Sequence, residues 1–248
     1  MEITHLSDSV SIKTVSEEGN KGVFVVEGLY TGYGLTLGNA LRRTLLSSLP
    51  GAAVTYIKIK GVPHEFSTIA GVKEDLIQIM LNFKTLRFKM SSDEPQVLVL
   101  KSKGEKKLTG GDIEANSLVE ILNPEVELVT ITEKGTEFDA EITVERGLGY
   151  SPVEARKTEK LPVGVVALDA FFSPVVSVNY NVENMRVGDR TDYNRLTLEI
   201  ETDGAITPSS ALHKATNILK DHFEKVAALE VHEMAESEKP AKKKTSKK

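Results

Sequence analysis

The sequence predicts an α+β fold in which a strand-rich middle is inserted between two ends that carry helices. Helical periodicity is found in three segments, and short alternating strands fill most of the chain between about residues 85 and 172. Strands and helices do not alternate regularly, as they would in a parallel βαβ sheet. We expect one module from 1–50 and 173–232, an inserted β-rich module from 51–172, and a disordered lysine-rich tail from 233–248.

The composition is that of an ordinary globular protein and excludes several kinds of functional site. The 248 residues carry a formal net charge of −5, so no overall positive field attracts nucleic acid. The sequence has no cysteine, which excludes disulfides, thiol nucleophiles and cysteine-ligated metals. The first residues lack a signal-peptide pattern, and no apolar run approaches the roughly 20 residues that span a membrane. We therefore expect a cytoplasmic protein that does not associate with membranes.

The first fifty residues predict two strands followed by an amphipathic helix. Hydrophobic and β-branched runs predict strands over 10–15 and 22–29, with SEEGNKG as the turn between them. A helix is predicted over 36–49, with Thr36 as its N-cap and with Pro50 ending it.

The middle of the chain predicts one helix among short strands. A strand is predicted over 53–61, and hydrophobic residues at helical spacing predict a helix over 72–84. These helical residues are Val72, Leu76, Ile79, Met80 and Phe83. Short strands follow, and 136–147 alternates strictly, which is typical of an antiparallel sheet with one solvated face.

Two further strands and a long helix are predicted in the last third of the chain. The strands cover 175–183 and 194–204, and the helix begins with Thr207 as N-cap and Pro208 at its first position. Its hydrophobic stripe continues to Leu229 and must be buried against another surface. That surface is either the chain's own core or a second copy of the protein, and the sequence leaves both open.

A glycine-rich turn ahead of the first helix raises a nucleotide-binding alternative. Gly32, Gly34 and Gly38 are spaced differently from a dinucleotide fingerprint, and no Gly-Lys-Ser/Thr ending of a Walker loop follows. We therefore interpret them as turn and packing glycines, with a nucleotide-binding enzyme as the second hypothesis. The scattered histidines and carboxylates form no recognisable catalytic set.

The first predicted helix carries two arginines and one unexpected leucine on its polar side. Leu46 projects into the arc that Asn39, Arg42 and Arg43 occupy. An apolar side chain surrounded by arginine and asparagine is typical of a small protein-contact site. A single exposed leucine is also normal on any surface, so the helix geometry alone leaves both interpretations open.

Three motifs in combination resemble one protein family. These are LGNALRR in the first predicted helix, GVKEDL at the start of the second, and RTDYNRLTLEI, which begins just before the last predicted strand and continues into it. Together they resemble the N-terminal assembly domain of bacterial DNA-directed RNA polymerase alpha subunits, over about residues 12–229. The resemblance implies a dimerisation module made of both chain ends and an inserted strand-rich module.

The resemblance implies a scaffold and not a catalyst. Family members form homodimers that nucleate core-enzyme assembly by binding the beta and beta-prime subunits. The catalytic magnesium of the nucleotidyltransferase is expected in beta-prime, so no catalytic residue, metal or cofactor is expected in this chain. Contact with DNA is expected only through the assembled, nucleoid-associated polymerase in the cytoplasm.

The family's contact positions map onto specific residues of this sequence. Arg43 and Leu46 fall on positions that bind the beta subunit, and Lys84 falls on a position tied to contact with the large subunits. The resemblance places the dimer interface on the first and last predicted helices. Its expected residues are Tyr33, Leu37, Leu41, Leu219, Phe223 and Val226.

The sequence also departs from the family pattern. Leu35 stands where histidine is usual, and Thr44 stands where an aliphatic residue is usual, so we expect differences of detail on the dimer side. We expect the family's second domain, a DNA-binding unit on a linker, to have no counterpart in these 248 residues, either because the lineage lacks it or because the sequence is a fragment. An alpha-like subunit of an archaeal or eukaryotic-type polymerase, which would form a heterodimer, remains a third alternative.

Overall fold

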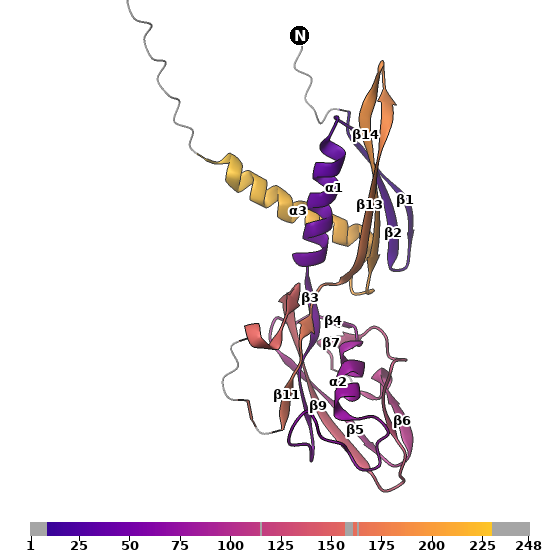
Figure 1. The fold of residues 1–248 in the computed structure, drawn as a ribbon, viewed down its shortest axis with the longest axis vertical. Coiled ribbons are helices and arrows are strands. Elements are labelled where there is room, and N and C mark those ends of the chain that lie inside the picture. The colour runs from indigo at the N-terminus through magenta and orange to yellow at the C-terminus, as the bar shows by residue number, and fades with distance from the viewer. Residues whose placement is uncertain (1–8, 115, 157–160, 163, 230–248) are drawn as a thin grey trace, which may run out of the picture.

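The structure, a computed structural model, describes residues 9–114, 116–156, 161–162 and 164–229. It is elongated, with a terminal module formed by both parts of the chain that flank a central module (Figure 1). Strands predominate, and three α-helices accompany them in the described residues. This mixed architecture confirms the predicted α+β fold class.

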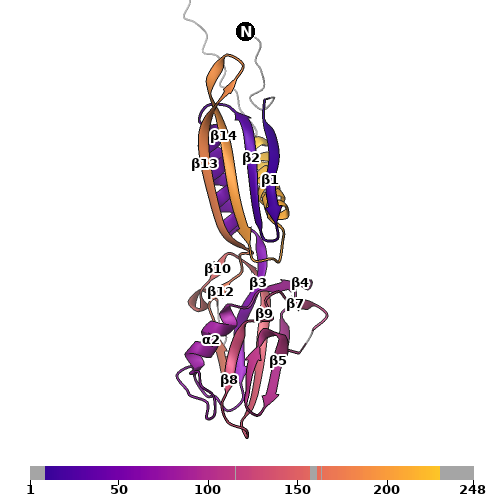
Figure 2. The same ribbon diagram turned by 90° about the vertical axis from the view of Figure 1, so that its right-hand side faces the viewer.

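The terminal module is a four-stranded antiparallel sheet with two helices on one face. The strand order is β1-β2-β14-β13, and Figure 2 shows the sheet from the face that carries no helix. Pairing of β2 with β14 joins the beginning of the chain to its last third. The elements are β1 (Ser11–Glu18), β2 (Lys21–Leu29), α1 (Tyr33–Ser47), β13 (Val175–Val187), β14 (Arg190–Thr202) and α3 (Pro208–Ala227).

The core of the terminal module lies between this sheet and the two helices. Alternation along β2 turns Phe24 and Val26 toward the helices, as alternation along a strand requires. Helix α1 contributes Leu41 and Leu45 to the same core. The other buried members are Leu29, Leu49, Val175, Val178, Leu196, Leu198, Ile200, Ala211, Leu212 and Ala215.

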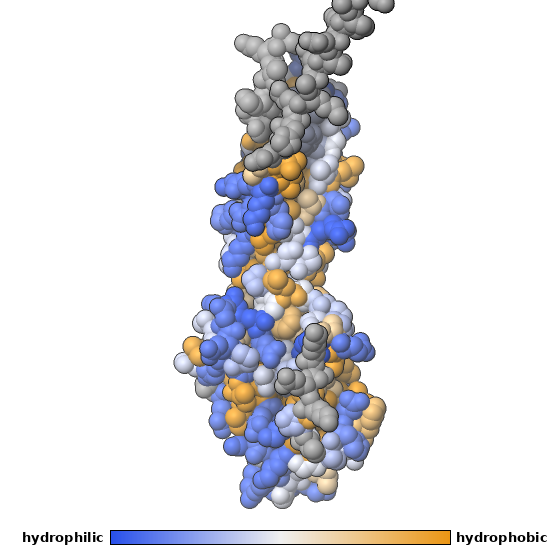
Figure 3. Space-filling view, turned by 90° about the vertical axis from the view of Figure 1, so that its left-hand side faces the viewer, coloured by the Kyte–Doolittle hydropathy of each residue, from blue (hydrophilic) through white to orange (hydrophobic). Residues whose placement is uncertain are grey.

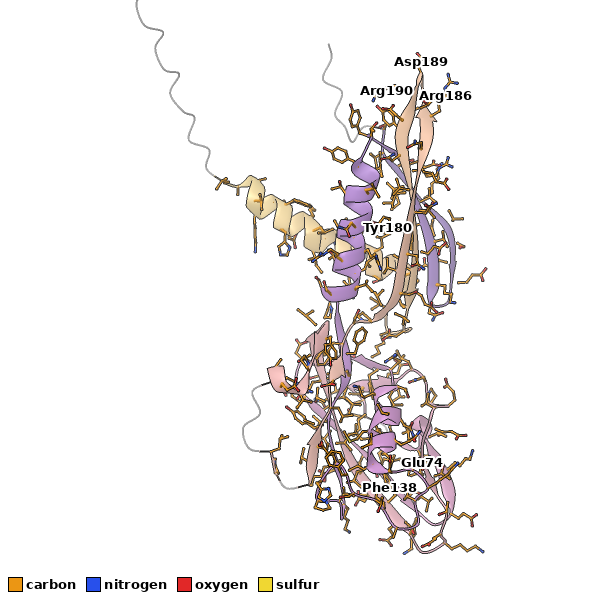
Figure 4. All side chains as sticks on the ribbon, in the orientation of Figure 1. Glu74, Phe138, Tyr180, Arg186, Asp189 and Arg190 are labelled. Atoms are coloured by element: carbon orange, nitrogen blue, oxygen red, sulfur yellow. The ribbon has the colours of Figure 1, made fainter. Side chains whose placement is uncertain are left out.

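Helix α1 lies directly on the sheet because two of its residues have no side chain. A methyl group added at Gly38 would lie 2.7 Å from Cδ2 of Tyr180, and one added at Gly34 would lie 2.7 Å from Cγ1 of Val182. Figure 4 shows the labelled Tyr180 beside α1. The glycines are thus packing residues, as the sequence predicted.

The central module is a mixed assembly around a larger antiparallel sheet. The sheet order is β5-β9-β3-β4-β7, with β11 paired to β3, and α2 (Leu76–Lys84) buries Leu76, Ile79 and Phe83 in the module's core. The remaining elements are β3 (Pro50–Ile59), β4 (Phe88–Met90), β5 (Gln96–Lys103), β6 (Lys106–Thr109), η1 (Gly110–Asp112), β7 (Val119–Ile121), β8 (Glu127–Ile131), β9 (Glu137–Leu148), β10 (Tyr150–Ser151), η2 (Val153–Ala155), β11 (Val165–Ala167) and β12 (Ala170–Phe171).

Helix α1 begins and ends earlier than the sequence predicts. It starts at Tyr33 after Gly32, whose left-handed backbone ends the preceding turn. Thr36 is therefore inside the helix, where its Oγ1 donates to the Gly32 carbonyl at 3.4 Å, and the predicted N-cap is wrong. The helix ends at Ser47, and Pro50 already begins β3.

Other predicted elements exist, with shifted limits. Strands β1 and β2 extend almost to a tight turn at Gly19, because ladder hydrogen bonds continue into the segment predicted as a longer turn. Val72 lies outside α2 and forms an isolated bridge with Ile131, and Asp75 caps the helix by accepting from the Gln78 N–H at 2.7 Å. For α3, the predicted start is confirmed, since Thr207 Oγ1 accepts from the Ser210 N–H.

The loop before α3 carries a partly buried carboxylate at the boundary between the modules. The Asp203 backbone N–H donates to the Pro174 carbonyl at 2.9 Å, and its Oδ1 accepts from the Ala205 N–H at 2.9 Å. Burial raises the pKa of Asp203, although the charge of Arg87 from the central module partly opposes that rise.

The two hydrophobic cores are separate, but the predicted domain limits stay a prediction. One core includes residues from Val54 to Leu168, and the other includes residues that precede Pro50 and follow Ser173. The predicted disordered tail over 233–248 lies outside the described residues.

Replacing Gly38 by valine is expected to destabilise the protein by about 1–3 kcal/mol, because the added side chain overpacks the contact with Tyr180. Asn39→Val places the same residue on the neighbouring exposed position and is expected to change stability by less than about 0.5 kcal/mol. Urea unfolding measures both values, and equal stabilities for the two variants would contradict the close approach.

Replacing Asp203 by asparagine is expected to stabilise the protein near neutral pH. The pKa of Asp203 in the folded protein lies above 3.8, the ordinary value of an aspartate carboxyl. Between these two pKa values the native state binds more protons than the unfolded state, so its stability falls as pH rises through this range. Asparagine does not ionise, so the variant does not lose this stability as pH rises, and its side-chain oxygen can still accept from the Ala205 N–H. The difference in unfolding free energy between variant and wild type should therefore increase from about pH 4 to 7. A difference that stays constant with pH would contradict the shift.

Candidate protein-contact surface

Backbone N–H groups at the N-terminal end of α1 already have hydrogen-bond acceptors within the chain. Asn194 Oδ1 accepts from the Gly32 N–H at 2.8 Å and from the Gly34 N–H at 3.4 Å, and the Tyr33 N–H donates to the Tyr30 carbonyl. A phosphate cradle needs free N–H groups at this position. The geometry therefore gives no support to the nucleotide-binding hypothesis.

A cluster of polar and aromatic residues holds the loop before α1 against the β13–β14 hairpin. The Arg190 guanidinium lies over the Tyr30 ring at 5.0 Å and the Tyr193 ring at 5.3 Å, and it donates to both oxygens of Asp192. Thr31 Oγ1 also donates to Asp192 at 2.7 Å. These contacts, first from Arg190 and then from Thr31, hold the pKa of Asp192 at about 2. Figure 4 shows Arg190 near the far end of this hairpin.

The two residues expected to bind the beta subunit lie near the end of α1. Arg43 is exposed, and no ion pair joins it to a carboxylate among the residues that the structure describes. Its backbone carbonyl accepts from Ser47 Oγ at 2.7 Å in the last turn. Leu46 is half-buried and packs partly against the terminal core, so it is not an isolated exposed leucine.

The expected dimer residues of α1 differ in their burial. Tyr33 is 49% exposed, and Leu37 is half-buried against the terminal core. Leu41 is only 4% exposed and lies inside that core, so it has little surface to offer a partner. Leu35, which the sequence analysis noted only as a family departure, is also a strongly exposed hydrophobic residue on this helix.

The second half of α3 exposes its hydrophobic stripe. The first half buries Ala211, Leu212 and Ala215, whereas Phe223 is 66% exposed and Val226 is 71% exposed. Leu219, between these halves, is partly buried against the core. Figure 1 shows this half projecting past α1 and away from the sheet, and Figure 3 shows apolar surface on the same side of the module.

Lys84 lies in the central module at the end of α2. Its Nζ is 3.8 Å from Oδ2 of Asp169, and both side chains are partly exposed. The Val153 N–H donates to Asp169 at 3.0 Å and lowers the pKa of that carboxyl, with a smaller contribution from Lys84. Asp169 could not be recognised from the sequence, because nothing in the local pattern pairs it with Lys84, which lies 85 positions earlier.

The described residues contain no group of three or more histidine, aspartate or glutamate side chains placed to hold a metal. In the same part of the chain, no helix combines the length and hydrophobicity needed to cross a bilayer. What the site does offer is exposed helix surface, with an arginine near one end of α1 and apolar side chains on α3. Such surface is suited to contacts with other proteins.

Comparison with known proteins identifies the family to which this chain is similar. Residues 57–173 match the family model described as the RNA polymerase Rpb3/RpoA insert domain. The chain is 54% identical over 215 residues to the DNA-directed RNA polymerase subunit alpha of Symbiobacterium thermophilum, which covers 86% of this chain and 68% of that relative. It is 54% identical over 202 residues to the protein of the same name from Moorella thermoacetica, covering 82% and 64%.

A third relative extends the similarity to almost the whole chain. The DNA-directed RNA polymerase subunit alpha of Carboxydothermus hydrogenoformans is 49% identical over 240 residues, which covers 94% of this chain and 76% of the relative. The matched part thus spans about two thirds to three quarters of the length of these relatives. Identity at this level over this share of both chains shows that the protein belongs to the bacterial DNA-directed RNA polymerase alpha-subunit family.

Proposed function

We propose that this chain is a homodimeric, non-catalytic scaffold that nucleates assembly of RNA polymerase by binding the beta and beta-prime subunits. The observation that carries the proposal is the pair of exposed helix surfaces on the terminal module, one on α3 and one near the end of α1. The choice of beta and beta-prime as partners follows from what the family resemblance implies, and membership of an RNA polymerase subunit family is consistent with it.

Self-association is supported by the apolar second half of α3. Phe223 and Val226, together with Leu229 just after the helix, are 66–74% exposed and form a hydrophobic surface that a monomer would leave in water. A second copy can cover it through a two-fold contact in which the same residues meet on both chains. Tyr33 and Leu35 on α1 add exposed apolar surface to the same module.

Binding of beta is supported by the position of Arg43 and Leu46 near the end of α1. Arg43 is free to make forked hydrogen bonds to carboxylates or carbonyl groups of a partner. Leu46 offers a partly exposed apolar side chain whose other side is fixed by the core. Arginine is among the residue types that most often dominate the binding energy of a protein interface.

The remaining parts of the proposal follow the family. Lys84, held near Asp169, is proposed to contact a large subunit. The catalytic magnesium belongs to beta-prime, and this chain is proposed to hold no cofactor. DNA is contacted only through the assembled enzyme, in the cytoplasm.

Replacing Arg43 by alanine is expected to abolish capture of the beta subunit and to leave the dimer intact. A loss of at least about 2 kcal/mol, or roughly 30-fold in Kd, is typical when a dominant interface arginine is removed. Size-exclusion chromatography of the variant mixed with beta provides the measurement.

Two matched variants sharpen that experiment. Arg42→Ala removes the neighbouring exposed arginine and should leave capture unchanged. Arg43→Lys keeps the charge but loses the forked geometry, so an intermediate affinity is expected. Normal co-elution of Arg43→Ala with beta would refute the assigned role.

Replacing Phe223 by arginine is expected to convert the dimer to a monomer, because a charge would have to be buried in the proposed self-contact. Asp221→Arg introduces the same side chain about 200° around the helix and should leave the dimer intact. Light scattering gives the mass of each variant. A monomeric wild type would contradict homodimerisation and favour a heterodimer with another chain.

A further inference from the structure

The two segments that connect the modules touch each other. The chain enters the central module at the start of β3, directly after α1, and returns through Phe172, Ser173 and Pro174 into β13. A methyl group added at Gly51 of β3 would overlap the Phe172 carbonyl oxygen and would lie 3.3 Å from Cδ of Pro174. The entering and returning segments are therefore in direct backbone contact.

Phe172 packs against two glycines that lie opposite each other on neighbouring strands. Gly51 and Gly147 are partners in the β3–β9 ladder, and a methyl group at Gly147 would lie 2.6 Å from the Phe172 ring. The Phe172 N–H donates to the Gly149 carbonyl at 2.8 Å. The side chain is only 6% exposed, yet it belongs to neither hydrophobic core. The Phe172 ring therefore packs at the junction between the modules and not in either core.

The junction around Phe172 lies close to both proposed contact residues, Arg43 and Lys84. On one side, a methyl group at Gly149 would lie 3.2 Å from the carbonyl oxygen of Ser47, which ends α1 one turn after Arg43. On the other side, Asp169 lies three residues before Phe172 and pairs with Lys84. The segment that holds Phe172 is thus connected to the helix of Arg43 and to the partner of Lys84.

We infer that Phe172 is a positioning residue that fixes the orientation of the central module relative to α1. The inference rests on the proposed function in one respect, because the fixed orientation presents Arg43 and Lys84 to a large subunit together. Two contacts on a rigid body reinforce each other, since the first one holds the second at a high effective concentration. A loosened junction weakens that reinforcement without changing either contact.

Spin-label distances test the orientation directly. Because the chain has no cysteine, Asn39→Cys on α1 and Gln78→Cys on α2 give two exposed labelling sites in the full-length protein. Labelled chains are diluted with unlabelled chains so that only distances within one chain are measured. The distance distribution is expected to be narrow with Phe172 and at least twice as broad with Phe172→Ala.

Matched variants separate the junction from general stability. Phe171→Ala removes the neighbouring aromatic ring, which is half exposed and is not among the atoms nearest to Gly51 or Gly147, and should keep the narrow distribution. Phe172→Leu retains an apolar side chain and replaces Phe172→Ala as the test variant if the latter does not fold. Its distance distribution is expected to have an intermediate width. Equal widths for wild type and a folded Phe172 variant would overturn the inference.

The affinity for the beta subunit tests the consequence. Phe172→Ala is expected to weaken beta binding about tenfold, and the coupling between Arg43→Ala and Lys84→Ala in a double-mutant cycle should fall toward zero. Unchanged affinity and coupling in a folded variant would refute this consequence. If Arg43→Ala has no effect in the wild-type background, the proposed function fails instead, and the distance measurement still decides the role of Phe172.

Discussion

The close approach of α1 to the sheet is the constraint on which the terminal module depends. Only residues without a side chain at positions 34 and 38 allow the helix to lie against Tyr180, Val182 and Leu196. That contact fixes the direction of α1, and therefore also fixes which of its residues face the core and which face outward. The start of the helix is held separately, by Asn194 at Gly32 and by the contact of Arg190 with Tyr30. The packing of α1 on the sheet and the contacts at its start together determine that Arg43, near its other end, is exposed.

Each module contributes residues both to a hydrophobic core and to exposed surface. Helix α3 uses its first half to complete the terminal core and leaves its second half uncovered. The central module keeps its own core around β3, β9 and α2, and contributes Lys84 to the outer surface. In the proposed scaffold, self-association and capture of a large subunit would therefore use different surfaces, so that one contact does not block the other.

Local signals predicted much of the fold, and long-range contacts account for the errors. The start of α3 was predictable because a threonine cap and a proline stand next to each other in the sequence. Val72 has helical spacing to Leu76, but the bridge to Ile131 decides its conformation, and that partner is 59 residues away. Similarly, nothing near Gly32 indicates that Asn194 will accept its N–H. Arg43 and Leu46 could be singled out as a candidate contact because they share one predicted helix, and their role in binding beta stays a prediction. The contacts of Phe172, in contrast, combine three separate segments, which no local pattern indicates.

The pairing of β2 with β14 has a consequence for how the chain folds during synthesis. The central module is continuous in sequence and can form as soon as it has left the ribosome. The terminal sheet cannot close until β14 appears, roughly 160 residues after the end of β2, or about 8–32 s at 5–20 residues per second. During this time the hydrophobic side of α1 has no sheet to cover it. The nascent chain would therefore carry exposed Leu41 and Leu45, and this interval is when chaperone protection would matter most.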